Sequence, residues 1–109
     1  MATRSNAPQN VLLDLNAPSF QRNLLSLDKT LRNEALNTLQ KIIQMDWQQV
    51  YRDQGLKWEK IYTIDPPQGV EAIYSLRITQ SRRAVAYRKG NFMCFIAIPP
   101  DHDATYGKK

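Results

Sequence analysis

The sequence predicts an α+β fold in which an N-terminal helical hairpin packs on one face of a small antiparallel sheet. Apolar residues recur at helical spacing between residues 20 and 45, and β-branched and aromatic residues gather in three short runs between residues 70 and 98. Helices that come first and strands that follow as a group are typical of α+β domains, in which the helices cover one face of the sheet.

The N-terminal segment has no regular pattern. Residues 1–10, "MATRSNAPQN", lack an apolar core and do not resemble a signal peptide, so we expect a flexible tail. Residues 11–109 then form a single domain, a length that supports one hydrophobic core. The run "VLLDL" at 11–15 is a possible short first strand.

Two helices are predicted between residues 20 and 45. Ser19 is a candidate N-cap for a helix that begins at Phe20, and Asp28 is a candidate N-cap for the second helix after a short corner at 26–28. The second helix carries an apolar stripe at positions i, i+4, i+8 and i+11, formed by Leu31, Ala35, Leu39 and Ile42.

The middle of the chain has weaker signals. Asp46 can cap a short third helix that Gly55 ends. Residues 56–64 are expected to be extended or irregular, and "DPPQG" at 65–69 predicts a turn because two prolines and a glycine forbid regular structure.

A three-stranded antiparallel meander is predicted in the last third of the chain. Strands at 70–78, 82–88 and 92–98 are joined by turns at 79–81 and 89–91. The last strand is almost wholly apolar, as a strand buried on both faces would be. Its single cysteine, Cys94, is predicted to be a small buried apolar residue, and a chain without cysteine pairs fits the reducing cytoplasm.

Positive charge is concentrated in the predicted sheet and the C-terminal tail. The net charge is +5, and residues 71–109 contribute +4 of it, from 7 basic and 3 acidic side chains. No segment has the roughly 20 apolar residues of a membrane span. Such a distribution favours a polyanionic partner, with solubility alone as the alternative.

The register of the hairpin decides where its arginines lie. A two-residue turn would place Arg83 beside Ile78 and Leu76 without a partner. A three-residue turn pairs Arg77 with Arg83 on the face opposite the apolar residues, and it is favoured because it avoids burying a lone charge. Two arginines directly opposite each other repel, unless an anion lies between them. The alternative is a carboxylate partner, Glu59 or Glu71.

The C-terminal tail holds the only histidine. His102 could transfer protons near neutral pH, and Tyr106 could reach the same region, although a tail histidine is more often solvated. The sequence has no cluster of His, Cys, Asp or Glu with metal-ligand spacing, so neither a metal site nor another cofactor is predicted.

The motifs together resemble the RelE/ParE superfamily of toxins from bacterial type II toxin–antitoxin modules. The resemblance runs from about Phe20 to the C-terminus. It rests on the helical hairpin, the segments "MDWQQVYRDQGLKWEKI" and "IYSLRITQSRRAVAYR", and the ending "PPDHDATYG". It implies a RelE-like fold and a metal-independent endoribonuclease that cuts mRNA on the ribosome and inhibits translation.

The resemblance also implies roles for individual residues. Arg77 and Arg83 would stabilise charge on the phosphate, His102 would move a proton, and Tyr106 would orient the substrate. Further contacts to RNA would come from Arg82, Arg88 and Lys89. The archetype has a lysine at the position of Ser75, and the glutamate base of some members has only Glu59 and Glu71 as candidates.

Partners and alternatives follow from the same resemblance. A cognate antitoxin protein, mRNA and the ribosome are the expected partners in the cytoplasm, with no membrane and no small-molecule cofactor. The alternatives are a ParE-like toxin that inhibits DNA gyrase without nuclease chemistry, and a degenerate relative that only binds RNA or protein. His102 favours the nuclease.

Overall fold

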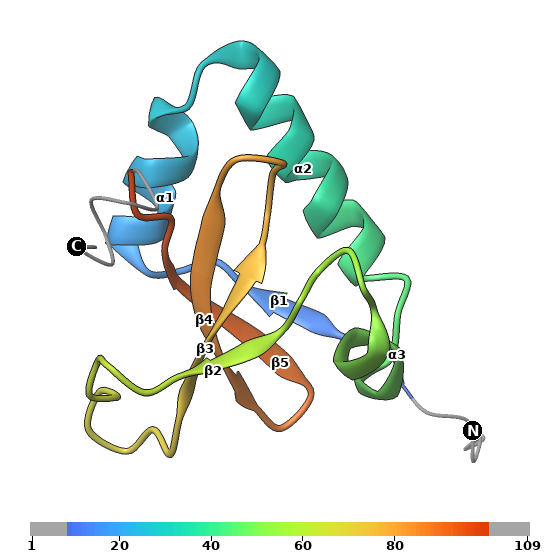
Figure 1. Cartoon of the computed structure of the whole chain (residues 1–109), viewed down its shortest axis with the longest axis vertical. Coiled ribbons are helices and arrows are strands. Elements are labelled where there is room, and N and C mark those ends of the chain that lie inside the picture. Colours follow the sequence, from blue (N-terminus) through green and yellow to red (C-terminus); the bar gives the residue numbers. More distant parts are fainter. Residues whose placement is uncertain (1–8, 101–109) are drawn as a thin grey trace.

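A computed structural model describes residues 9–100 of the chain, as three helices and five strands (Figure 1). Most of the predicted tail, together with His102 and Tyr106, lies outside the described residues. In chain order the elements are β1 (Leu12–Asp14), α1 (Pro18–Ser26), α2 (Lys29–Ile42), α3 (Trp47–Arg52), β2 (Glu59–Ile61), β3 (Ile73–Arg77), β4 (Arg83–Lys89) and β5 (Phe92–Ala97).

The sheet is larger than predicted and mixed. Its order is β1-β5-β4-β3-β2, and β3, β4 and β5 form the expected antiparallel meander. The expectation of a purely antiparallel sheet was wrong, because β1 pairs with β5 in parallel. β2 adds a further antiparallel strand beside β3. Strands of three residues are too short to show an alternating pattern, so their pairing could not be predicted from sequence.

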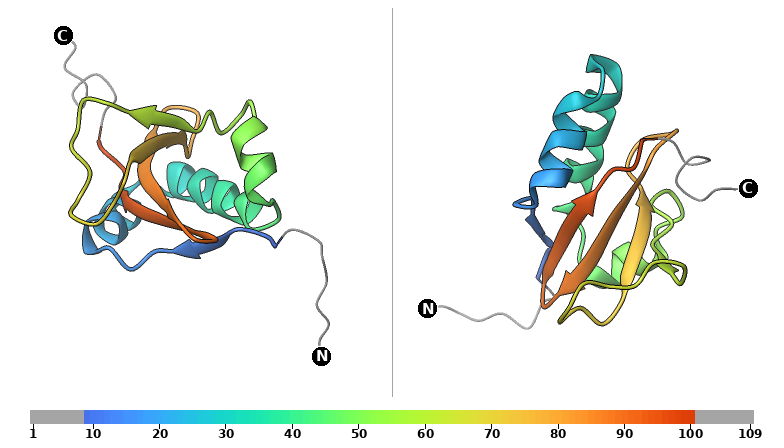
Figure 2. Two further views of the ribbon diagram at one scale, coloured as in Figure 1. Left: turned by 90° about the horizontal axis from the view of Figure 1, so that it is seen from below. Right: turned by 90° about the vertical axis from the view of Figure 1, so that its left-hand side faces the viewer.

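The α1–α2 hairpin covers one face of the sheet, as predicted (Figure 2). The two rings of Phe20 on α1 and Phe95 on β5 lie 4.9 Å apart between centroids. On α2, Ala35, Leu39 and Ile42 of the predicted stripe are buried. This packing supplies most of the stability of the helices, since isolated helices of this length are marginal in water.

Two predicted N-caps are confirmed and one is wrong. The Asp28 carboxylate accepts from the Leu31 N–H, and Asp46 forms a full capping box with Gln49. Ser19 is not a cap, because α1 begins at Pro18, two residues before the predicted start at Phe20, and Ser19 lies inside the helix. The Ser19 hydroxyl instead donates to the Ile96 carbonyl and ties α1 to β5. α3 ends at Arg52, before the predicted stop at Gly55.

Cys94 is buried, as expected, and is a free thiol with 4% of its surface exposed. Burial raises the pKa of the Cys94 thiol, and the nearby Asp14 carboxylate raises it further. Because the thiolate is the reactive form, both effects make this cysteine inert. Among the helices of residues 9–100, none is long and apolar enough to cross a membrane.

We predict that Cys94 reacts with a thiol reagent such as DTNB more than about tenfold more slowly in the native protein than in denaturant, at pH 8. If native Cys94 reacted as fast as the thiol of a free peptide, its burial on β5, between β4 and β1, would be contradicted.

Candidate functional site

The β3–β4 turn has the register that the sequence predicts. Arg77 pairs directly with Arg83, and Leu76 pairs with Ala84. The Ile78 N–H donates to the Arg82 carbonyl over 3.0 Å, which closes a three-residue turn at 79–81. This turn therefore sets the two arginines opposite each other on neighbouring strands.

Helix α2 holds the turn in place. The Thr38 hydroxyl donates to the Ile78 carbonyl over 2.7 Å. The Gln80 N–H donates to the Glu34 carboxylate over 3.2 Å. Two hydrogen bonds from one helix to the turn resist a change of register, because a slip by one residue would break both.

The register sends the apolar and the basic side chains to opposite faces. Leu76, Ile78 and Ala84 are fully buried in the core on the helix side. Since side chains alternate along a strand, Arg77 and Arg83 lie on the other face. The face that the α1–α2 hairpin leaves free is thus the basic one.

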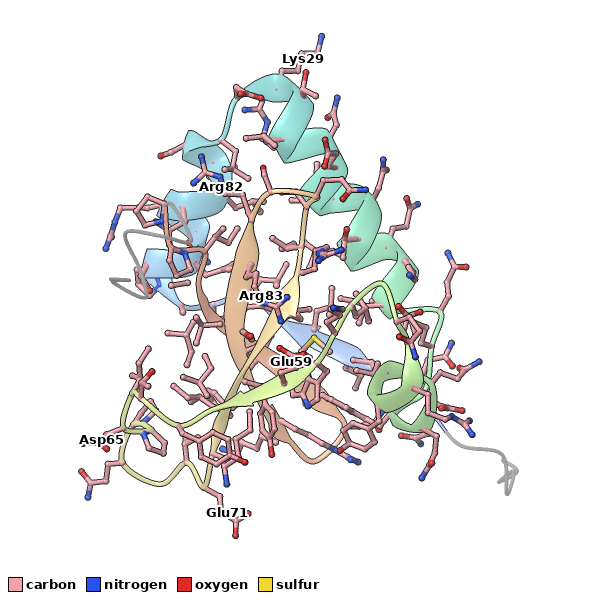
Figure 3. The ribbon with its side chains drawn as sticks, viewed as in Figure 1. Lys29, Glu59, Asp65, Glu71, Arg82 and Arg83 are labelled. Atoms are coloured by element: carbon pink, nitrogen blue, oxygen red, sulfur yellow. The ribbon has the colours of Figure 1, made fainter. Side chains whose placement is uncertain are left out.

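Arg83 is held by neighbours within the fold. Its Nε and Nη2 donate to the Ser75 hydroxyl over 3.1 and 2.9 Å, and Nη2 donates to the Lys57 carbonyl over 2.7 Å. Nη2 also lies 3.6 Å from the Glu59 carboxylate, and Figure 3 shows the two side chains together in front of the sheet. The Arg83 side chain is only 19% exposed, but Glu59 is 64% exposed. Water therefore screens the pair from the Glu59 side, and the ion pair contributes little stability.

The loop between α3 and β2 presents the carbonyl that Arg83 binds. Lys57 has a φ of 50°, in the left-handed region that residues other than glycine rarely adopt. The Leu56 N–H just before it donates to the Asp53 carboxylate over 2.8 Å. Burial alone would raise the pKa of Asp53, but the hydrogen bonds from Leu56 and Lys41 outweigh burial and lower the pKa.

Arg77 differs from Arg83 in its contacts. Its backbone N–H donates to the Leu56 carbonyl over 2.7 Å, which fixes the strand. Within residues 9–100, no hydrogen bond or ion pair engages its guanidinium group. Among the described residues, nothing therefore occupies the donors of the Arg77 guanidinium, whereas the Arg83 guanidinium is already oriented by its neighbours.

A cleft of about 500 Å³ contains both arginines. We call it the basic cleft, because five basic side chains and a single carboxylate line it, for a formal charge of +4. Glu59 offsets only part of the repulsion between these cations. The lining residues are Lys57, Glu59, Lys60, Ile61, Tyr62, Thr63, Ser75, Arg77, Gln80, Ser81, Arg82 and Arg83.

The structure separates the other residues that the sequence singled out. Arg82 lines the basic cleft but also borders a hollow beside the α1–α2 corner. Arg88 and Lys89 lie at the opposite end of β4 and line a second cleft. Of the two candidate carboxylates, Glu59 is in the basic cleft and Glu71 lies at the far end of the sheet (Figure 3).

The sequence analysis did not predict several residues of the basic cleft, and three of them shape it most. Ser75 and Lys57 orient Arg83 with a hydroxyl and a carbonyl. Tyr62 follows β2 and is 82% exposed, with the Lys60 ammonium 5.2 Å from its ring centroid. The sequence around Tyr62 does not show that its ring is exposed. No sequence pattern predicts the left-handed backbone conformation of Lys57.

Among the comparisons with known proteins, only the comparison with solved structures found proteins similar to this chain. No family model and no curated protein matches the sequence. The chain is similar to a copper-bound mutant toxin from Helicobacter pylori, with 18% identity and a TM-score of 0.49, over 86% of this chain and 97% of that one. It is also similar to a YoeB dimer from Staphylococcus aureus, with 19% identity and a TM-score of 0.49, over 88% of this chain and 100% of that one. At these levels neither similarity assigns the chain to a family.

The part of the chain that the structure describes holds no group of three or more His, Cys, Asp or Glu side chains placed to bind a metal ion. The chemistry available within the basic cleft is therefore that of guanidinium, ammonium, hydroxyl and one carboxylate. Guanidinium pairs bind phosphate oxygens with matched geometry, so the cleft is suited to a phosphate diester.

The two arginines should differ in their effect on stability. We predict that Arg83→Ala lowers the free energy of unfolding by about 1–2 kcal/mol, because it removes hydrogen bonds to Ser75 and Lys57. Arg77→Ala should change it by less than about 0.5 kcal/mol, as should the control Lys29→Ala on α2. Urea unfolding measures these differences, and equal losses from both arginines would contradict the assignment.

Proposed function

We propose that the chain is the toxin of a type II toxin–antitoxin module and cuts mRNA on the ribosome without a metal ion. The observation that carries the proposal is the in-register pair Arg77 and Arg83 in a cleft with a formal charge of +4. Like charges directly opposite each other destabilise a sheet. An anionic ligand bound between the two arginines would offset this repulsion. The substrate, a phosphodiester of mRNA, is inferred from the resemblance of the hairpin to RelE-like toxins.

The reaction is attack of a ribose 2′-hydroxyl on the adjacent phosphorus. The P–O bond to the 5′-oxygen of the next nucleotide breaks, which leaves a 2′,3′-cyclic phosphate and a 5′-hydroxyl. Negative charge grows on the non-bridging oxygens of the phosphorane. Arg77 and Arg83 would stabilise that charge, a contribution of about 3–4 kcal/mol for each group in comparable sites.

Two protons must move in this reaction, one from the 2′-hydroxyl to a base and one from an acid to the leaving 5′-oxygen. Glu59 is the carboxylate of the cleft and would accept the first proton. His102 would donate the second, a role that rests on the resemblance because His102 lies outside the described residues. The exposed ring of Tyr62 would support a base by stacking, a role that the resemblance also gives to Tyr106.

The cognate antitoxin would act by covering the basic cleft. An acidic segment or helix laid across Arg77 and Arg83 would neutralise the cleft and exclude RNA. Such a complex would form in the cytoplasm, where mRNA is translated.

We predict that induced expression of the chain arrests growth and produces new mRNA 5′ ends within translated regions. Arg77→Gln should reduce the rate of mRNA cleavage by about 10²–10³-fold while its thermal unfolding stays as in the wild type. His102→Ala should also relieve the arrest. Lys29→Gln, which removes one charge at the start of α2 away from the cleft (Figure 3), should remain fully toxic.

Two outcomes would overturn the nuclease. Full toxicity of both Arg77→Gln and His102→Ala would leave no role for the cleft. Growth arrest with intact mRNA and stabilised DNA cleavage complexes would instead favour the ParE-like gyrase inhibitor.

A further inference from the structure

A second cleft, of about 580 Å³, lies at the other end of β4. We call it the aromatic cleft, and it shares no lining residue with the basic cleft. The wall opposite β4 is the loop 68–72, which leads into β3. Its lining residues are Tyr51, Trp58, Gln68, Gly69, Val70, Glu71, Ala72, Tyr74, Tyr87, Arg88 and Lys89.

The rings of the aromatic cleft are fixed by one another. Trp58 and Tyr74 stack with centroids 4.7 Å apart and planes within 16°. Trp47 meets Trp58 edge-on at 5.2 Å. Trp58 and Tyr74 are only half-buried, so they keep surface that faces the cleft. Rigid aromatic surfaces bind a flat ligand with little loss of side-chain entropy.

Arg88 provides an oriented cation at this cleft. Its guanidinium lies 4.6 Å from the centroid of the Trp47 ring, Nη1 donates to the Tyr51 hydroxyl over 2.6 Å, and Nε donates to the Gly90 carbonyl over 2.7 Å. Its Nη2 takes part in no hydrogen bond among residues 9–100. Lys89 is exposed beside it, and Glu71 is the one carboxylate of the lining.

Packing of α3 against the sheet explains why Trp47 is buried. It does not explain the half-exposed rings, or the Arg88 Nη2 donors that no residue within 9–100 engages. Aromatic faces beside an oriented guanidinium match the two parts of a nucleotide, the base and the phosphate. A nucleotide is thus the ligand class that uses both features at once.

The two clefts are close enough for one RNA strand. Arg83 and Arg88 are five residues apart on β4, about 17 Å at roughly 3.4 Å per residue. A straight path of that length corresponds to about five stacked nucleotides at roughly 3.4 Å each. The two side chains leave opposite faces of β4, but β3 begins at Ile73, so Arg88 and Lys89 have no β3 partner. The end of the sheet there gives a path from one face to the other.

We propose that the aromatic cleft binds a nucleotide of single-stranded RNA at a position a few nucleotides from the scissile phosphate. The base stacks in the cleft and the phosphate contacts Arg88 and Lys89. The identity of the polymer rests on the proposed function, whereas the nucleotide chemistry of the cleft does not.

Tryptophan emission reports this cleft directly, because both tryptophans of the chain belong to its aromatic cluster. The probe is a ten-nucleotide RNA with 2′-O-methyl groups throughout, which cannot be cleaved by 2′-hydroxyl attack. An end label on the RNA reports total binding by anisotropy. We expect the RNA to quench tryptophan emission, and we expect Arg77→Gln to weaken binding but to keep the quenching at saturation.

Charge variants assign the contact to this cleft. Lys89→Gln should weaken RNA binding about fivefold or more and reduce the slope of log K against log salt by roughly 0.7. Arg88→Gln should do the same, with its fold checked by thermal unfolding because Arg88 also packs on Trp47. The exposed charge control Lys29→Gln should change neither quantity.

Three results would overturn the proposal, and a fourth would separate it from the proposed nuclease. If the RNA binds by anisotropy but leaves tryptophan emission unchanged, with Lys89→Gln and Arg88→Gln as in the wild type, RNA binds elsewhere and the nuclease proposal stands. If AMP quenches as strongly and as tightly as the RNA, the cleft is a mononucleotide site. If only an acidic peptide quenches, it is a protein-binding site. Quenching by RNA in a protein that leaves cellular mRNA intact would retain this site and refute the nuclease.

Discussion

The arrangement of the site depends on one constraint, the three-residue turn between β3 and β4. The turn pairs Arg77 with Arg83, and α2 fixes it through Thr38 and Glu34. A shift of one residue would turn Leu76 and Ile78 out of the core and bring arginines into it. The hydrophobic core therefore enforces the pairing of the two cations, and the energy of burying Leu76 and Ile78 outweighs the repulsion, which amounts to a few tenths to about 1 kcal/mol.

The paired arginines differ in how firmly their guanidinium groups are held, and this difference determines how the site can bind an anion. Arg83 is oriented by Ser75, Lys57 and a partly solvated Glu59. The guanidinium of Arg77 is engaged by none of the described residues, so it can respond to a ligand. One fixed donor set, beside a cation that no residue within 9–100 engages, can bind a phosphate without reorganising the strand. Ser75 stands where the resemblance leads one to expect a lysine, and its hydroxyl orients an existing cation instead of adding another.

Much of this could be predicted because it is local. The caps at Asp28 and Asp46, the stripe on α2 and the β3–β4 register each follow from residues close in sequence. The missed features depend on distant partners. β1 pairs with a strand about 80 residues away, and Arg88 meets Tyr51 across 37 positions. Glu59 and Glu71 could not be separated by sequence, because the choice depends on β2, a strand too short to have a pattern.

The most direct test of the arginine pair as a phosphate site is a crystal structure of the protein bound to a short RNA carrying 2′-O-methyl groups. We expect a phosphate between the guanidinium groups of Arg77 and Arg83, with its oxygens within hydrogen-bond distance of both and the Glu59 carboxylate beside the 2′-oxygen. RNA bound elsewhere, with Arg77 in solvent and Arg83 still confined to Ser75, Lys57 and Glu59, would contradict it.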